Sequence, residues 1–255
     1  MFKGIYSAES EPYFFSFSAH AALPETARVE LPALDRAKLS IQDNASDKKV
    51  GPYRYGVPIP LTEAQSKRVS VDNGQWQTFK TGEMLWQSEV FAAGATTVDV
   101  LLKPFWLPQN AKLTIFDGTD KQIWGPFGHE QNNLANTLPL PLVSGDTMRI
   151  ELSVPSNERQ FVRLAVHTVN QGYRALDVID GQLVAKEAGG CNVDVVCPAG
   201  DPYRDQARGV VRILANGGLC TGTLINSTRN DRAALMLTAN HCSITAANAS
   251  GVMAY

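Results

Sequence analysis

The residues best suited to chemistry in this sequence are His241 and Cys242, which follow an apolar run at residues 233–238. A second cysteine, Cys220, begins an earlier run of small and β-branched residues, and turn-forming residues at 226–231 separate the two runs. This pattern predicts two short strands joined by a turn. A disulfide between Cys220 and Cys242 would close the unit and hold the imidazole of His241 beside the bridge.

A histidine at the end of a strand has two interpretations. It is either a half-buried structural residue or a group that transfers protons in a catalytic site. The residues around His241 favour the second interpretation, because several of them match one pattern independently. This pattern, C-x-G-x-L-I followed by L-T-A-x-H-C, resembles the region around the catalytic histidine of trypsin-like serine proteases. The matching positions are Cys220, Gly222, Leu224, Ile225, Leu237, Thr238, Ala239, His241 and Cys242.

A narrower resemblance begins upstream, at residues 191–213. This stretch is similar to the mature N-terminus of bacterial lysyl endopeptidases, a secreted branch of the trypsin-like proteases that includes arginine-directed relatives. The matching positions are Cys191, Asn192, Asp194, Cys197, Pro198, Gly200, Asp201 and residues 208–211. The resemblance implies a serine endopeptidase that cleaves protein or peptide substrates after lysine, or after arginine, with no cofactor.

The resemblance also implies what each site residue does. His241 would be the general base that activates a serine hydroxyl, and an aspartate would fix its tautomer. In trypsin-like enzymes the chain order is histidine, aspartate, serine, so both partners should follow residue 241. The residues after 241 contain neither that aspartate nor the serine in its glycine-rich setting, and Ser243 is too close in sequence to be the nucleophile. We therefore expect a C-terminally truncated chain that is inactive alone, with the N-terminal part of a trypsin-like double β-barrel.

The four cysteines all lie in the last quarter of the chain. The resemblance implies that Cys191 and Cys197 pair with cysteines further downstream and are unpaired in this fragment, although a local Cys191–Cys197 bridge stays an alternative. A zinc site built from Cys191, Cys197, His241 and Cys242 is another alternative. The Cys191–Cys197 spacing disfavours it, because it is longer than that of the usual zinc knuckle. We expect no metal and an oxidising, secreted location, extracellular or periplasmic.

Composition excludes several classes of partner. The chain has 255 residues, 44% of them hydrophobic, which is enough for one large or two ordinary domains. A formal net charge of −2 does not provide the excess of positive charge that is typical of nucleic-acid-binding proteins. The apolar runs are much shorter than the roughly 20 residues of a membrane-spanning helix, so no membrane partner is expected.

Residues 62–180 carry a repeated pattern of short strands and turns. Alternating or β-rich segments end near residues 79, 91, 102, 117, 154 and 169, and none has a sustained helical period. The regular spacing predicts an all-β domain, an antiparallel β-sandwich of jelly-roll type. By resemblance this would be the pro-domain of a protease precursor and an intramolecular partner of the protease domain.

The rest of the chain divides around this sandwich. Residues 1–27 hold a degenerate or misassigned secretory signal, because Glu9 and Glu11 interrupt the apolar stretch. Residues 28–61, rich in prolines after residue 50, are expected to form a pro-segment arm. Residues 181–190 are a polar, glycine-rich linker, residues 191–255 are the incomplete protease domain, and Lys186 is the expected processing site.

One rival function rests on the tryptophans. Trp76, Trp86, Trp106 and Trp124 could form a carbohydrate-binding or adhesion surface, with the protease-like tail non-catalytic. The other interpretation is core packing, which their position within or beside strands favours. His129 and His167 have no evident partner in the sequence and are expected on the surface.

Overall fold

The fold was analysed in a computed structural model, which describes residues 27–46, 51–73, 76–174, 176–179, 182–184, 193, 195–229, 231 and 233–255. These residues form a mostly β structure, as the sequence predicts, in which the α-helices are short. The helices are α1 (Arg36–Ser46), α2 (Glu63–Arg68) and α3 (Arg204–Ala207). In the part of the chain described, no helix is both long and apolar enough to cross a bilayer.

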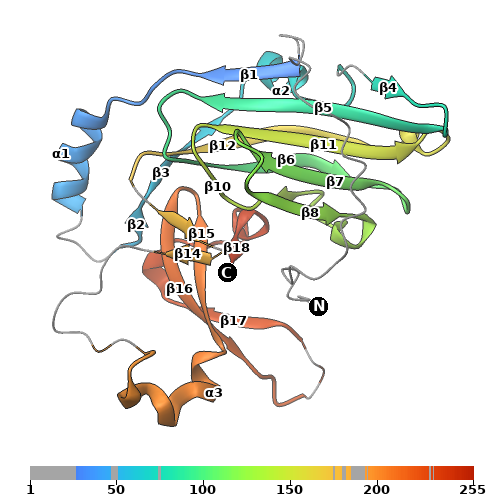
Figure 1. Ribbon diagram of the computed structural model, residues 1–255. Coiled ribbons are helices and arrows are strands. Elements are labelled where there is room, and N and C mark those ends of the chain that lie inside the picture. Colours follow the sequence, from blue (N-terminus) through green and yellow to red (C-terminus); the bar gives the residue numbers. More distant parts are fainter. Residues whose placement is uncertain are drawn as a thin grey trace.

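A six-stranded sheet forms one layer of the upper part of the molecule (Figure 1). Its strands are β1 (Arg28–Leu31), β4 (Trp76–Thr78), β5 (Glu83–Ala92), β7 (Lys112–Asp117), β8 (Ile123–Phe127) and β11 (Thr147–Pro155). Strand β11 lies between β5 and β7 and pairs antiparallel with both. Its residues alternate between buried and partly exposed positions, because successive side chains of a strand point to opposite faces.

A five-stranded sheet forms the second layer. It contains β3 (Gly56–Pro60), β6 (Thr97–Trp106), β9 (Leu138–Pro139), β10 (Val143–Ser144) and β12 (Arg163–Gly172). Strand β12 pairs antiparallel with β6 on one side and with β3 on the other. The six segments that the sequence predicted as strands correspond to β4, β5, β6, β7, β11 and β12.

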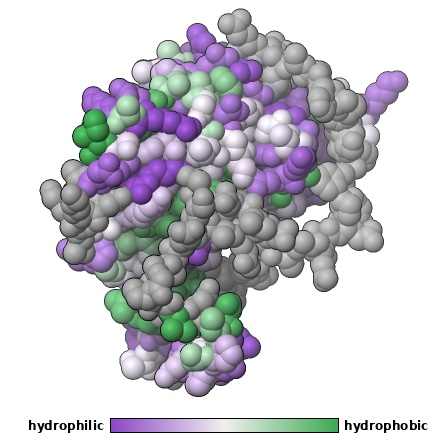
Figure 2. All heavy atoms as spheres, turned by 60° about the vertical axis from the view of Figure 1, so that its left-hand side comes forward, coloured by the Kyte–Doolittle hydropathy of each residue, from purple (hydrophilic) through white to green (hydrophobic). Residues whose placement is uncertain are grey.

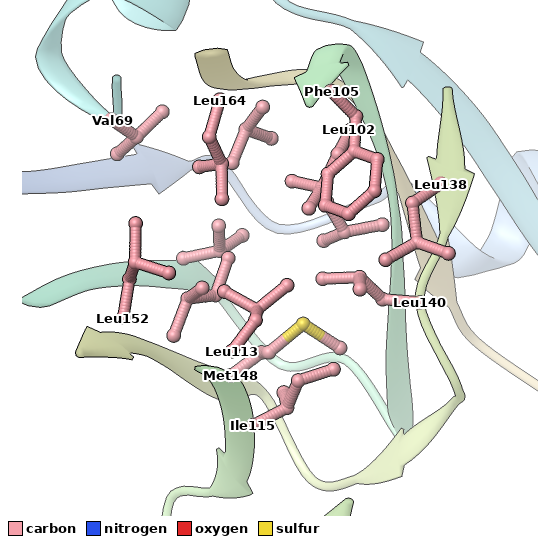
Figure 3. Close-up of a cluster of buried hydrophobic side chains, with 14 of the residues drawn as sticks. Val69, Leu102, Phe105, Leu113, Ile115, Leu138, Leu140, Met148, Leu152 and Leu164 are labelled. Carbon is pink, nitrogen blue, oxygen red and sulfur yellow. The ribbon is translucent and has the colours of Figure 1, made fainter. Parts of the chain in front are cut away.

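The two sheets share one hydrophobic core. Figure 3 shows side chains of both layers pointing toward each other, among them Leu102 and Leu164 from one sheet and Leu113, Met148 and Leu152 from the other. All five are almost completely buried. Burial of this core stabilises the two layers against each other, at roughly 25 cal/mol for each Å² of apolar surface removed from water.

The tryptophans divide between this core and the surface. Trp86 and Trp124 are buried and Trp76 packs against the core, whereas Trp106 is 46% exposed. The four indoles therefore do not form one exposed aromatic platform. The core interpretation holds for three of them.

A third sheet lies below the two layers (Figure 1). It contains β2 (Tyr53–Arg54), β15 (Val210–Ala215), β16 (Gly218–Ile225), β17 (Leu235–Thr238) and β18 (Met253–Ala254). Strands β15 and β16 form a hairpin whose turn, Asn216 and Gly217, has φ angles of 51° and 73°. Positive φ at both positions is typical of the type I′ turn that suits a two-residue hairpin. Two further strands, β13 (Asp177–Ile179) and β14 (Gln182–Val184), pair only with each other.

Residues 28–61, expected as an arm, contribute strands to all three sheets. β1 pairs parallel with β5, β3 pairs with β12, and β2 pairs with β16. The expected signal region up to residue 26 and most of the expected linker at residues 181–190 lie outside the described residues.

Candidate functional site

The candidate site lies on strand β16, which carries Cys220, and at the end of strand β17, which leads into the turn with His241 and Cys242. They pair antiparallel from Gly222 opposite Thr238 to Ile225 opposite Leu235. Gly222 fits its position closely, because a Cβ there would lie 2.7 Å from Cδ1 of Ile213 and 2.9 Å from Sδ of Met236, and both side chains would have to shift. The glycine of the motif thus leaves room for the side chains of Ile213 on β15 and Met236 on β17 to pack against the backbone of β16.

A tight corner follows β17. The chain turns through one 3₁₀ turn, Asn240–Cys242, in which the amide of Cys242 donates to the carbonyl of Ala239 at 3.0 Å. The hydroxyl of Thr238 donates to the carbonyl of Thr221 at 2.8 Å and lies 3.3 Å from Sγ of Cys242. Ser243 ends the turn with φ 56°, in the left-handed region. The threonine of the motif therefore ties the start of the corner to β16.

The predicted disulfide between Cys220 and Cys242 is present, with Cα atoms 6.0 Å apart. The side-chain ligand atoms of Cys220, His241 and Cys242 all lie within 4.8 Å of one another. Cys242 is buried and His241 is exposed. The bridge therefore ties Cys242, the residue after His241, to β16, and the imidazole of His241 stays accessible to solvent.

Among the residues that the structure describes, Cys220, His241 and Cys242 are the group whose side chains could hold a metal. In the disulfide form the two sulfurs are not thiolates, and thiolates are what zinc binds. Cys197 is free and does not belong to this group, and Cys191 lies outside the described residues. The four-residue zinc site considered from the sequence is therefore not assembled in the described part of the chain.

The imidazole of His241 has no side-chain hydrogen bond or ion pair within the described ranges. The hydroxyl of Ser243 donates to the backbone carbonyl of His241 at 3.4 Å, so it is directed at the backbone and not at the imidazole. Chemically, the arrangement offers an accessible imidazole next to a disulfide-anchored backbone, and the described residues supply neither an orienting carboxylate nor a nucleophile.

The chain after the corner returns to the third sheet. The side chain of Asn248 accepts from the amide of Thr245 at 2.7 Å and donates to the carbonyl of Ser243 at 2.9 Å. Strand β18 then pairs with β15 at Ile213 and Leu214. These contacts close residues 243–254 into a compact loop behind the corner.

The motif residues around Cys197 form a second compact turn. The 3₁₀ segment Pro198–Tyr203 follows the cysteine directly. A Cβ on Gly200 would collide with the carbonyl oxygen of Val195. The guanidinium of Arg204 donates to the carbonyls of Val195 and Val196 and to a carboxylate oxygen of Asp201 at 2.6 Å. Cys197 is therefore held half-buried, in a turn away from the Cys220, His241 and Cys242 group.

The outer part of the third sheet has apolar side chains in contact with solvent. Six large apolar residues of β15, β16 and β17 are between 36% and 63% exposed: Val210, Leu224, Ile225, Leu235, Met236 and Leu237. Consecutive residues of a strand point to opposite faces, so exposed apolar side chains lie on both faces of the sheet. Figure 2 shows hydrophobic residues gathered on the lower part of the molecule. The inner part of the sheet is packed, since Ile213 and Leu214 are buried, whereas these six outer residues are not covered by other described residues.

The other histidines named from the sequence lie apart from the site. His129 is 3.5 Å from Glu130 of the same short 3₁₀ segment. Nδ1 of His167, on β12, is 2.8 Å from the hydroxyl of Thr168. Lys186, the expected processing position, lies outside the described residues.

Comparisons with known proteins bear on the same region. Residues 185–255 match the family described as lysyl endopeptidase, C-terminal domain. A lysyl endopeptidase of Pseudomonas aeruginosa is 27% identical over 207 residues, covering 75% of this chain and 43% of that protein. The chain thus spans less than half the length of this curated relative. The 207-residue match is much longer than the family match, so it includes residues of the two-layered part.

Proposed function

We propose that this chain is part of a secreted serine endopeptidase precursor of the lysyl endopeptidase type, with His241 as the general base. The observation that carries the proposal is the exposed imidazole of His241 beside the Cys220–Cys242 bridge, within the segment that matches the family. The substrates would be proteins or peptides cut after lysine, with arginine as the second choice. No cofactor is required by this chemistry.

The mechanism follows from what a fixed imidazole does for a weak nucleophile. A serine hydroxyl attacks a peptide carbonyl only when a base within hydrogen-bond reach takes its proton. His241 would accept that proton and later give it to the leaving amine. A carboxylate on the other ring nitrogen would hold the tautomer. Because the described residues supply neither partner, the chain as given is proposed to be inactive alone.

The exposed apolar face of the third sheet supports the proposal of a truncated domain. Apolar residues on both faces of a strand pair are typical of a sheet that is covered by further structure. We propose that this sheet is the first part of a trypsin-like double β-barrel. The remaining strands, the aspartate and the serine would then belong to chain beyond Tyr255, in keeping with the length of the curated relative.

The two-layered part is proposed to be the pro-domain, with jelly-roll-type connectivity. The long match to a lysyl endopeptidase supports this, because it includes upstream residues. Cleavage after Lys186 in the linker is the proposed processing step, and Cys191 and Cys197 are proposed to pair with cysteines further along the complete protein. The disulfide supports an extracellular or periplasmic location.

The carbohydrate-binding alternative rested on an exposed surface of four tryptophans, and the observed exposure of their side chains does not favour it. Of the four tryptophans, Trp106 is the one with a largely exposed side chain. A single indole does not make a stacking platform. We therefore keep the endopeptidase as the proposed function.

Reading the coding DNA beyond the codon for Tyr255 tests the truncation. We expect an open frame that encodes an aspartate, then a serine in a glycine-rich setting, and further cysteines. A stop codon at that point would overturn the proposal that this gene product hydrolyses peptide bonds.

A further inference from the structure

One short segment of the arm joins the third sheet to the two-layered part. We call residues 52–56 the strap. Within it, Arg54 pairs with Gly218 and Tyr53 with Leu219, so that β2 adds to β16 as an antiparallel strand. Gly218 also pairs with Ala215 of β15 on the other edge, so β2 lies on the same edge of β16 as β17. The strap is thus bound in the way that an extended peptide adds to a sheet.

Tyr55 anchors the strap between the two parts. Its side chain is completely buried and belongs to a small hydrophobic cluster with Leu142, Leu176 and Leu214. Leu214 comes from β15 of the third sheet, and Leu142 belongs to the two-layered part. The hydroxyl of Tyr55 donates to Oδ2 of Asp99 on β6 at 2.7 Å. One aromatic side chain therefore fills the junction and is fixed by a polar bond at its tip.

The turn of the third sheet is shaped to receive the strap backbone. The carbonyl of Gly217 accepts from the amide of Tyr55 at 2.9 Å and from the amide of Gly56 at 3.1 Å. A Cβ on Gly217 would collide with the carbonyl oxygen of Gly56. The absence of a side chain at position 217 is therefore what lets the strap approach.

A cluster of charged and polar groups holds the strap from the upstream side. Asp43 on α1 accepts from Nη2 of Arg54 at 2.6 Å and from Nε of the same guanidinium at 2.8 Å. The hydroxyl of Tyr173 donates to the other oxygen of Asp43 at 2.7 Å. Because Asp43 is 5% exposed, this carboxylate is a fixed point that positions Arg54 and with it the strap.

Two further bonds cross the junction. The amide of Leu142 donates to the hydroxyl of Tyr255 at 2.9 Å, and the hydroxyl of Thr137 donates to the carbonyl of Ser250 at 3.2 Å. Both join residues of the two-layered part to the end of the third sheet. Neither bond involves a residue of the linker.

We propose that the edge of β16 at residues 217–219 and the pocket around Leu214 form a binding surface for the strap, which keeps the third sheet bound to the two-layered part after the linker is cut. The partner is the upstream region of this same chain, held non-covalently. Release of the strap would uncover the backbone of residues 218 and 219, next to Cys220 and the candidate site. The inference takes cleavage of the linker from the proposed function, but the binding itself requires no peptide-bond hydrolysis by this chain.

The test uses the full chain with the recognition sequence of an added endoprotease placed in the linker at residues 185–190. After cutting, the two pieces are run on a size-exclusion column and diluted in steps to obtain their dissociation constant. We expect the pieces to elute together. Gly217→Ala should raise the dissociation constant by about 5- to 150-fold, because overpacking against the strap backbone costs about 1–3 kcal/mol.

The matched control is Gly94→Ala. Gly94 has φ +68°, close to the +73° of Gly217, but a Cβ there has no neighbour within 4 Å. Gly94→Ala therefore reports the backbone strain of a positive φ without a steric collision. Thermal unfolding of the uncut Gly217→Ala and Gly94→Ala variants checks that both fold. Amide hydrogen exchange of residues 53–56 in the cut parent gives a measurement without any substitution, and slow exchange is expected.

Two results would overturn the proposal. If the pieces of the parent separate at once, the surface does not hold them. If they stay together while residues 53–56 exchange rapidly and Gly217→Ala matches Gly94→Ala, other contacts hold them and the strap does not. Both results are independent of the protease proposal, because an added enzyme cuts the linker.

Discussion

Replacing Asp99 by asparagine is expected to remove a pH dependence from the stability of this chain. Asp99 lies on β6 and is almost fully buried. Tyr55 donates to its Oδ2 at 2.7 Å, and Nδ2 of Asn170 donates to its Oδ1 at 2.5 Å. Burial raises the pKa of Asp99 to about 6, from an ordinary value of 3.8, although the two hydrogen bonds act in the opposite direction.

The sign and size of the effect follow from this shift. A carboxyl group with a raised pKa binds its proton more tightly in the folded state than in the unfolded state. Its contribution to the free energy of unfolding is complete below pH 3.8 and is lost as the pH rises to about 6. A shift of roughly two pH units corresponds to about 3 kcal/mol. The neutral asparagine side chain resembles the protonated carboxyl, since its amide N–H can donate to the hydroxyl oxygen of Tyr55.

The assay is urea unfolding of the parent and of Asp99→Asn at a series of pH values from 3.5 to 7.5, chosen to bracket the two pKa values. Other carboxyl groups titrate in both proteins, so the informative quantity is the difference between the two free energies of unfolding. We expect the stability of Asp99→Asn relative to the parent to rise by about 2.4 kcal/mol between pH 4 and pH 7. A difference that does not change with pH would refute the reasoning.

Two further predictions concern the third sheet. Gly222→Ala should lower the free energy of unfolding by about 1 kcal/mol, because its Cβ would displace Cδ1 of the buried Ile213 while the exposed Met236 can move aside, and urea unfolding measures the loss. Replacing Cys220 and Cys242 together by serine opens a loop with a sequence separation of 22 and should cost about 3 kcal/mol, measured as a shift in the thermal midpoint.

Each of these predictions has its own control. Gly51→Ala controls for Gly222→Ala, because a Cβ at position 51 meets nothing within 4 Å. Equal effects of the two substitutions would contradict the packing argument. For the disulfide, a reducing agent should lower the midpoint of the parent and leave that of the double serine variant unchanged. A midpoint that reductant lowers equally in both proteins would count against a contribution from this bridge.

The parts of the fold that could be predicted from sequence are those with a local signature. Strand β11 could be predicted because residues 147–155 alternate with a period of two, and this alternation is imposed by a core on one face. Strand β3 could not, because its Pro58 and Pro60 read as turn-formers. In the structure they are accommodated on a strand at the edge of its sheet, where a missing N–H is tolerated.

The same distinction applies to the candidate site. Cys220, His241 and Cys242 could be found from sequence because one hairpin and one turn bring them together. The strap could not be found, because Tyr53 and Leu219 are far apart along the chain and no local pattern specifies their pairing. The buried Asp99 was missed for the same reason, since its partner Tyr55 comes from a different part of the chain.

The central claim is that His241 is the base of a serine endopeptidase. The most direct test expresses the complete reading frame and measures hydrolysis of a peptide amide after lysine by the parent, by His241→Ala and by His167→Ala as the control on an exposed histidine of β12. We predict that the parent and His167→Ala are active and that His241→Ala loses activity on the order of 10⁴-fold or more. Full activity of folded His241→Ala, or none in the parent, would contradict the claim.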